Sequence, residues 1–245
     1  MIQYNYNDSI NILRDIHWVG FYDEQADLHC NPYLMVDGLD VILFDPGSIP
    51  HFSIVMRKII DLIHPESINH IVASHQDPDI CGNLPVMEDL INNPELRIIT
   101  ESGCVRLIQH YGINSKYFKV DKNNNKLILK SGRVLEFIPT PYLHSPFAIM
   151  TYDIKTKTLF SSDIFGTVSK DWELFKEINS TFKAMKLWHQ AIMPSNVILK
   201  KCMEKLQDMD IERILPQHGS IIEGSAEVKT AITFLKDLPC RIDLD

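Results

Sequence analysis

Short apolar stretches separated by polar turns run through the first half of the chain. Residues 33–38 (YLMVDG) and 41–45 (VILFD) predict the two strands of a β-hairpin. Residues 51–65 (HFSIVMRKIIDLIHP) carry apolar side chains at helical spacing and predict a helix that stops at the final proline. Residues 69–74 (NHIVAS) predict a short buried strand. The polar run at 123–125 (NNN), between YFKV and KLILK, predicts the turn of another hairpin.

The second half repeats this mixture of strands and helices. Residues 133–140 (RVLEFIPT) predict a strand, and residues 147–163 predict two strands around a Lys-Thr turn. The remaining predicted elements are helices near 171–191, 195–207 and 225–236, and a strand at 212–216. Because a similar pattern occurs twice, we expect an α/β (α+β) protein with two sheets packed face to face and helices outside, rather than one doubly wound parallel sheet.

Composition narrows the class of protein. The 245 residues are 45% hydrophobic and 23% charged, which is typical of a soluble globular protein. The formal charge of −8, with no basic patch, argues against a nucleic acid partner. No apolar run approaches the roughly 20 residues of a membrane span, and the N-terminus does not resemble a secretory signal. Five scattered cysteines favour reduced thiols, so we expect a cytoplasmic protein without a membrane partner.

Four predicted strands lead into loops that carry metal-binding side chains. These side chains are His75, Asp77 and Asp79 in the first loop, then His144, Asp163 and His218 in the other three. A single histidine after a strand is more often an ordinary surface residue, and the aspartates would serve equally well in turns. Four loops with this chemistry in one chain nevertheless predict a metal site. The cysteines lack C-x-x-C spacing, so a tetrahedral zinc-thiolate site is not expected, and Cys81 is expected to pack.

Several segments resemble the metallo-β-lactamase superfamily, and within it the diiron domain of flavodiiron proteins. The segments IHWVGFYD, NPYLMVDG and VILFDPGS are similar to the opening strand and first hairpin of that domain. PYLHSPFAIMTYD, LFSSDIFG and PQHGS are similar to its third-ligand loop, its bridging-aspartate segment and its final histidine loop. The resemblance implies a four-layer αββα sandwich. It also implies that residues 1–245 form one metallo-β-lactamase-like diiron domain, with no flavodoxin domain.

The resemblance also implies a ligand set. By position, one iron would be bound by His75, Asp77 and His144, the other by Asp79 and His218, with Asp163 bridging them. Flavodiiron proteins carry Glu and His where this chain has Asp77 and Ile80, so its H-x-D-x-D-I pattern is similar to the stand-alone oxygen-binding diiron proteins. The implied cofactor is two iron ions (Fe²⁺/Fe³⁺) with a bridging oxo, hydroxo or peroxo group, and no flavin in this chain.

Residues close to the expected irons have predicted roles of their own. Ile80 withdraws one ligand, which leaves a position for O₂, and its apolar side chain should exclude water from the site. His17, His29, Tyr33 and Tyr142 lie in segments that should approach the metals, where each would donate a hydrogen bond to a ligand or to oxygen. An ordinary buried polar role fits each of these four residues equally well.

The leading prediction is a non-haem diiron protein that binds O₂, or NO, as a peroxo-type adduct. It would act as an oxygen sensor, or as an oxygen reductase with a separate electron donor, so a donor or signalling protein is the expected partner. A homodimer is expected from the family alone. Two alternatives stay open: a zinc-dependent hydrolase, against which the missing histidines count, and a metal-free interaction module, against which the six ligand-type residues count.

Overall fold

The computed structural model describes residues 4–244, which fall into two compact units. The first unit contains the chain up to Asp23 and Cys30–Val134, and the second contains Glu24–His29 and the chain from Leu135 on. Two short strands, β3 (Phe21–Asp23) and β4 (Leu28–Cys30), form a hairpin of their own. Each unit has its own sheet and helices, and each is described by itself.

A seven-stranded sheet of order β1-β2-β5-β6-β7-β8-β9 forms the centre of the first unit. The strands are β1 (Ile10–Leu13), β2 (Ile16–Trp18), β5 (Tyr33–Asp37), β6 (Asp40–Phe44), β7 (His70–Val72), β8 (Arg97–Thr100) and β9 (Lys116–Lys119). Neighbours among β1, β2, β5 and β6 pair antiparallel, whereas β6, β7, β8 and β9 run parallel. The parallel strands therefore end at one edge, where their loops can bring functional side chains together.

The described residues of this unit contain four α-helices: α1 (Phe52–Ile60), α2 (Pro78–Cys81), α3 (Leu84–Ile91) and α4 (Ser102–Ile108). Helix α1 buries Val55, Met56 and Ile59. Its Lys58 side chain is also fully buried, with Nζ 4.0 Å from the centre of the Trp18 ring and 2.5 Å from the Gly20 carbonyl oxygen that accepts its hydrogen bond. The cation–π contact and this hydrogen bond compensate for only part of the lost hydration, because burial still lowers the pKa of Lys58 to about 7.

His70 on β7 makes the stability of this unit sensitive to acid. Burial lowers the pKa of His70 to about 4, and its Nδ1 lies 2.8 Å from the Asn69 side-chain oxygen. The unfolded chain, with a histidine pKa near 6.5, binds a proton more readily than the folded one. The free energy of unfolding therefore falls as the pH drops from about 6.5 to about 4, by up to about 3 kcal/mol for this group.

We expect His70→Gln to reduce the loss of stability between about pH 7 and pH 4.5 by about 2–3 kcal/mol relative to the wild type. Urea unfolding of both proteins at the two pH values measures this difference. Because His29 and His189 also have pKa values lowered to about 4, some acid sensitivity should persist in the variant. An equal loss in both proteins would exclude His70 as a source.

Five strands of the second sheet begin at or after Val134, whereas its first strand (residues 126–128) lies within the residue range of the first unit. The six-stranded sheet has the order β10-β11-β12-β13-β14-β15. Its strands are β10 (Lys126–Ile128), β11 (Val134–Pro139), β12 (Ile149–Asp153), β13 (Thr158–Ser162), β14 (Arg213–Pro216) and β15 (Ile222–Glu223). The pairs β11–β12, β12–β13 and β14–β15 are antiparallel, whereas β13 and β14 are parallel.

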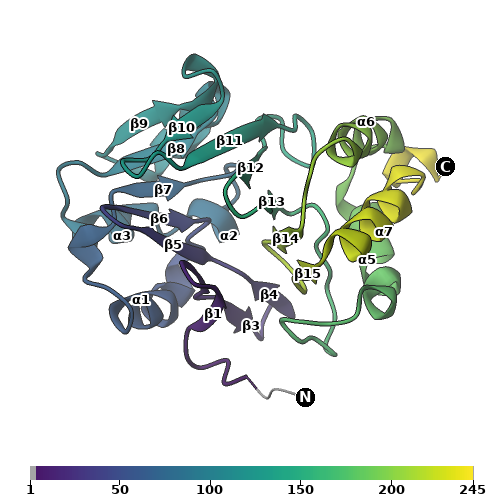
Figure 1. Cartoon of the computed structure of the whole chain (residues 1–245), viewed down its shortest axis with the longest axis horizontal. Helices are drawn as coiled ribbons and strands as arrows, with labels where there is room; N and C mark the ends of the chain where they lie inside the picture. The colour runs from purple at the N-terminus through teal and green to yellow at the C-terminus, as the bar shows by residue number, and fades with distance from the viewer. Residues whose placement is uncertain (1–3, 245) are drawn as a thin grey trace. The chain divides into compact units, whose positions relative to one another are not determined.

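Up to residue 244, this unit has three α-helices: α5 (Ile178–Ile192), α6 (Asn196–Gln207) and α7 (Ser225–Lys236). They lie next to one another beside β14 and β15 (Figure 1). Apolar side chains of the strands and of all three helices form one core, which includes Leu159, Ile214, Met185, Leu199 and Ile232. The apolar stripe of each helix is buried against the sheet or a neighbouring helix, which is the usual source of helix stability in proteins.

Most of the elements predicted from the sequence are present, including the two sheets and the hairpin at 33–45. The hairpin predicted around residues 123–125 is wrong, because β9 pairs in parallel with β8 and β10 belongs to the other sheet. The helix predicted from about residue 171 begins only at Ile178. Between residues 4 and 244, no helix is long and apolar enough to cross a membrane.

All five cysteines are buried thiols. Burial raises the pKa of Cys104 to about 11, of Cys202 to about 12 and of Cys240 to about 11, and it raises the pKa of Cys81 further. Cys202 and Cys240 belong to the apolar core of the second unit. The thiols of these four cysteines therefore stay protonated at neutral pH.

Candidate metal centre

The loop that follows β7 carries the first three predicted ligands. The preceding residue, Ser74, donates its backbone N–H to Oδ1 of Asp45, at 2.8 Å. Asp45 follows the parallel neighbour β6 and has a φ of 46°, in the left-handed region that few side chains adopt. The Ser74 hydroxyl in turn lies 3.3 Å from Nδ1 of His75. The ends of two adjacent parallel strands thus fix the start of the ligand loop.

Helix α2 is held by contacts with another loop of the same unit. The Gly47 N–H donates to the Ile80 carbonyl at 3.0 Å, and the Asn83 N–H donates to the Gly47 carbonyl at 3.1 Å. Gly47 has a φ of +94°, which strongly favours glycine, and an added Cβ would lie 3.2 Å from the Phe21 ring. The Tyr111 hydroxyl donates to the Gln76 carbonyl at 3.2 Å. These bonds fix the backbone that carries Asp77 and Asp79.

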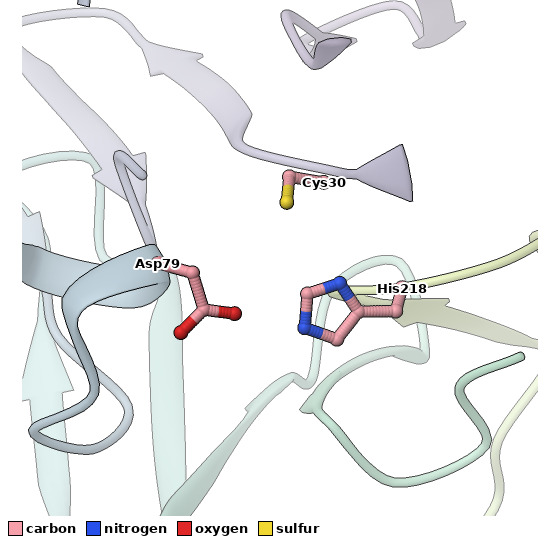
Figure 2. Close-up of side chains that lie close together, drawn as sticks. All are labelled: Cys30, Asp79 and His218. Carbon is pink, nitrogen blue, oxygen red and sulfur yellow. The ribbon is translucent and has the colours of Figure 1, made fainter. Parts of the chain in front are cut away.

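The structure brings together His75 and Asp77 from this loop. Nε2 of His75, which is buried, lies 3.6 Å from Oδ2 of Asp77, which is about one-third exposed. The Asp79 carboxylate projects from α2, and Cys30 Sγ lies within 4.8 Å of one of its oxygens (Figure 2). Ile80 is fully buried. The sequence prediction missed Cys30, because a lone cysteine at the end of a strand carries no spacing signal.

In the second unit, a parallel strand pair positions Asp163 and His218. Ser162 at the end of β13 lies opposite Pro216 at the end of β14, so the residues that follow both strands emerge at the same edge. The Gln217 N–H donates to the Ser162 carbonyl at 2.8 Å and extends this pairing into the loops. The convergence of strand ends expected from the sequence is therefore present for Asp163 and His218.

The two carboxylate oxygens of Asp163 face two different imidazoles. Oδ2 lies 2.7 Å from Nε2 of His144, and Oδ1 lies 3.5 Å from Nε2 of His218. Asp163 and His218 are buried, whereas the His144 side chain is 22% exposed. A carboxylate that faces a nitrogen ligand on each side has the arrangement needed to bridge two ions. The structure thus brings together the three predicted ligands of this unit.

A hydrogen bond at the ring nitrogen that points away from Asp163 fixes the orientation of the His218 ring. Its Nδ1 donates to the His29 carbonyl at 2.9 Å, which leaves Nε2 directed towards Asp163. The His29 ring stacks on Trp172 at 3.9 Å, and burial lowers the pKa of His29 to about 4, which favours the neutral ring. The contact between His29 and this predicted ligand is thus made through the backbone carbonyl of His29.

Helix α5 supports the loop that carries Asp163. The Trp188 Nε1–H donates to the Asp163 carbonyl at 2.9 Å, and the Phe165 N–H donates to Nε2 of His189 at 3.1 Å. Nδ1 of His189 donates to the Met185 carbonyl at 2.7 Å. Both ring nitrogens of this fully buried histidine are thus engaged, and burial lowers its pKa to about 4. His189 is a positioning residue that keeps the backbone after Asp163 in place.

The other residues predicted to approach the metals have different surroundings. His17 lies on the face of β2 opposite the buried Trp18, and partial burial lowers its pKa. Tyr33 lies in register with Phe44 and is buried, which raises its pKa despite a hydrogen bond with Asn31. Tyr142 is 55% exposed in the loop before His144.

The donor atoms of these histidines and aspartates fit iron. Ligand atoms bonded to one ion at about 2.1 Å and at right angles lie about 3 Å apart, and the His–Asp distances of 2.7, 3.5 and 3.6 Å are close to that value. Imidazoles combined with carboxylates are ligands that iron accepts readily. Both aspartates in these pairs present an oxygen towards an imidazole nitrogen, as ligands of a shared ion do.

Residues 28–219 match the family described as "ODP family beta lactamase". The chain belongs to this family. Among relatives by sequence, an uncharacterized protein of Methanocaldococcus jannaschii is 29% identical over 86% of this chain and 56% of its own length. The anaerobic nitric oxide reductase flavorubredoxin of Vibrio vulnificus is 27% identical over 87% of this chain and 46% of its own length. The chain thus spans about half the length of these two curated relatives.

Solved structures of the ODP family have the same fold. The apo state of the chemotaxis sensor ODP from T. denticola is 28% identical, with a TM-score of 0.81 over 96% of this chain and 95% of that one. A peroxy diiron species of the chemotaxis sensor ODP is 26% identical, with a TM-score of 0.79 over 96% and 97% of the two chains. Rubredoxin oxygen:oxidoreductase of Desulfovibrio gigas, at 23% identity, has a TM-score of 0.82 over 94% of this chain and 61% of its own. The mixed α/β fold expected from the metallo-β-lactamase resemblance is confirmed.

Proposed function

We propose that this member of the ODP family is a non-haem diiron protein that binds O₂. The observation that carries the proposal is the Asp163 carboxylate, whose two oxygens lie 2.7 Å and 3.5 Å from the Nε2 atoms of two different histidines. The similarity to a chemotaxis sensor for which a peroxy diiron species has been solved supports the same chemistry here.

The proposed ligand set is the one implied by the sequence resemblance. It consists of His75, Asp77 and His144 for one iron, Asp79 and His218 for the other, and Asp163 for both. When bound, the two ferrous ions would supply two electrons to O₂, and its full reduction to water would take two more from a separate electron donor. The protein residues hold the metals, orient the imidazoles and limit access of water.

Residues around the proposed ligands orient them and limit the supply of protons. The His29 carbonyl accepts the Nδ1 proton of His218, so that Nε2 of this ring is the nitrogen available to a metal. Trp188 and His189 hold the backbone on both sides of the Asp163–Phe165 turn. Ile80 is fully buried and offers no donor or acceptor, so it brings no proton towards bound oxygen. These features favour holding O₂ over reducing it rapidly.

We infer sensing as the role that fits this arrangement best, with oxygen reduction through a separate electron donor as the alternative. A sensor needs only that O₂ binds two conformations of the protein with different affinity. NO is a second candidate ligand, because a relative that is 27% identical is an anaerobic nitric oxide reductase. A signalling partner or an electron donor would contact the surface of this chain in either case.

The test is an anaerobic titration of the apoprotein with Fe²⁺, followed by addition of O₂ and a time course of visible absorption. We expect uptake of about two irons per chain and an absorption band that persists. Ile80→His should shorten the lifetime of the band at least several-fold, because an imidazole adds a ligand and a path for protons. Ile60→His, at a position of α1 that is 55% exposed, is the matched control and should behave as the wild type.

Three results would contradict parts of this proposal. Tight binding of zinc without uptake of iron would favour a zinc-dependent hydrolase of the superfamily instead. Uptake of two irons with immediate loss of the band would favour a reductase. An unchanged lifetime of the absorption band in Ile80→His would show that Ile80 does not control how long oxygen is held.

A further inference from the structure

Cys30 and Asp79 lie side by side in the first unit. Cys30 is the last residue of β4, and Asp79 belongs to α2. The Cys30 Sγ and an Asp79 carboxylate oxygen are no more than 4.8 Å apart, and Figure 2 shows the two side chains next to each other. The Cys30 side chain is only 2% exposed. A buried thiol and a half-buried carboxylate, both able to bind a metal, thus lie next to each other.

The other thiols of the chain have surroundings of a different kind. Cys81 Sγ lies 3.3 Å from the Asp77 carbonyl, and Cys240 Sγ lies 3.4 Å from the Leu238 carbonyl. Cys202 is part of the apolar core of the second unit, and Cys104 is fully buried in α4. These four positions have packing or backbone contacts that account for a small apolar side chain. Cys30 lies with its Sγ no more than 4.8 Å from a carboxylate oxygen of Asp79, a member of the proposed ligand set.

We propose that Cys30 supplies a thiolate ligand to the iron that Asp79 binds. This inference rests on the proposed function. With Ile80 in place of an imidazole, the Asp79 iron has few protein ligands, and a soft thiolate is a good ligand for iron. On binding, the S–H bond breaks and its proton passes to water. The sulfur lone pair then forms the S–Fe bond, and the oxidation state of the iron does not change.

The distance between the two side chains is compatible with this role. Bonds of about 2.3 Å to sulfur and about 2.1 Å to oxygen, at right-angled or tetrahedral geometry, place the two ligand atoms about 3–4 Å apart. A closure of about 1 Å, within reach of a small side-chain rotation, brings the atoms from the upper limit of 4.8 Å into this range. The thiolate would add one negative charge to the site, which favours ferric over ferrous iron.

Cobalt(II) added to anaerobic apoprotein tests the thiolate directly, because Co²⁺ reports its ligands without turnover. Visible ligand-field bands report that the metal is bound, and a near-ultraviolet sulfur-to-cobalt charge-transfer band reports a thiolate ligand. We expect both signals in the wild type. Cys30→Ala and Cys30→Ser should keep the ligand-field bands and lose the charge-transfer band. Cys104→Ala, which removes another fully buried thiol of the same unit, should keep both.

The outcomes separate this inference from the proposed function. Ligand-field bands without a charge-transfer band in the wild type would overturn the thiolate ligand and leave the metal site intact. A charge-transfer band that persists in Cys30→Ala would overturn the assignment to Cys30. Failure of the folded wild type to take up Co²⁺ would overturn both. The serine variant keeps the test valid if the alanine variant does not fold, because its hydroxyl is close in size to the thiol.

Discussion

Asp163→Asn is expected to abolish binding of the iron pair, with affinity for Fe²⁺ reduced at least about 100-fold. Loss of a residue that only orients a metal ligand typically costs 10–100-fold in affinity, and Asp163 is proposed to bind both irons itself. The amide keeps the shape of the side chain but removes its negative charge and one acceptor oxygen. The variant should therefore take up less than about one iron per chain in the anaerobic titration.

Asp171→Asn is the control for this experiment. The Asp171 side chain is 91% exposed and pairs with Lys176, so its loss should leave iron uptake unchanged. Circular dichroism of both variants checks that the fold persists. Uptake of two irons with wild-type affinity by Asp163→Asn would refute the bridging role of this residue.

Arg133→Met is expected to lower the free energy of unfolding by about 3–5 kcal/mol. The Arg133 guanidinium is buried and pairs with Asp15, in the turn between β1 and β2, and with Asp37, at the end of β5, where Nη1 lies 3.2 Å from Oδ1. Asp37 is buried as well and accepts a hydrogen bond from Ser131. Removal of one partner of a buried ion pair leaves an uncompensated charge, which accounts for the large loss.

Urea unfolding measures this effect, and two further variants test its cause. Adding Asp37→Asn to Arg133→Met should restore part of the stability, because the unpaired buried charge is then gone. Arg57→Met, at a side chain that is 48% exposed, should change the stability by less than about 0.5 kcal/mol. Equal losses for Arg133→Met and Arg57→Met would contradict the role of the buried pairs.

Local patterns in the sequence predicted strands correctly where elements that follow one another along the chain also pair with each other. The hairpin of β5 and β6 and the strands on both sides of the Lys-Thr turn follow directly from alternating apolar runs with a turn between them. The same pattern around Asn124 predicted a hairpin that the structure does not contain. The two flanking segments have strand character, but β9 pairs in parallel with β8, a contact that a local turn signal does not report.

The start of α5 was set by contacts with a distant segment. Residues near Leu174 have helical spacing, yet the Leu174 carbonyl accepts a hydrogen bond from the Ile221 N–H, and Phe175 forms a parallel bridge with Ile221. The hydroxyl of Ser220 also donates to the Glu173 carbonyl. These bonds keep the segment extended and delay the helix to Ile178.

For the site, the sequence identified residue types at strand ends, and the structure adds their geometry. The pairing of β13 with β14 explains why Asp163 and His218 meet, and nothing in the sequence reports that the Asp163 carboxylate faces two rings. The supporting contacts of His189 and Trp188 are equally invisible, since both lie in an ordinary amphipathic helix. The joint use of the six proposed ligands remains a prediction.

The raised pKa values of four buried thiols bear on oxidative damage. Thiolates, rather than thiols, react with peroxides and other products of oxygen chemistry. Cys104, Cys202 and Cys240 have pKa values of about 11, 12 and 11, and that of Cys81 is raised further, so at pH 7 only about one in ten thousand or fewer is ionised. A protein proposed to hold oxygen thus keeps these sulfur atoms in their unreactive form. It should withstand repeated exposure to air without sulfenic acid accumulating at these four positions.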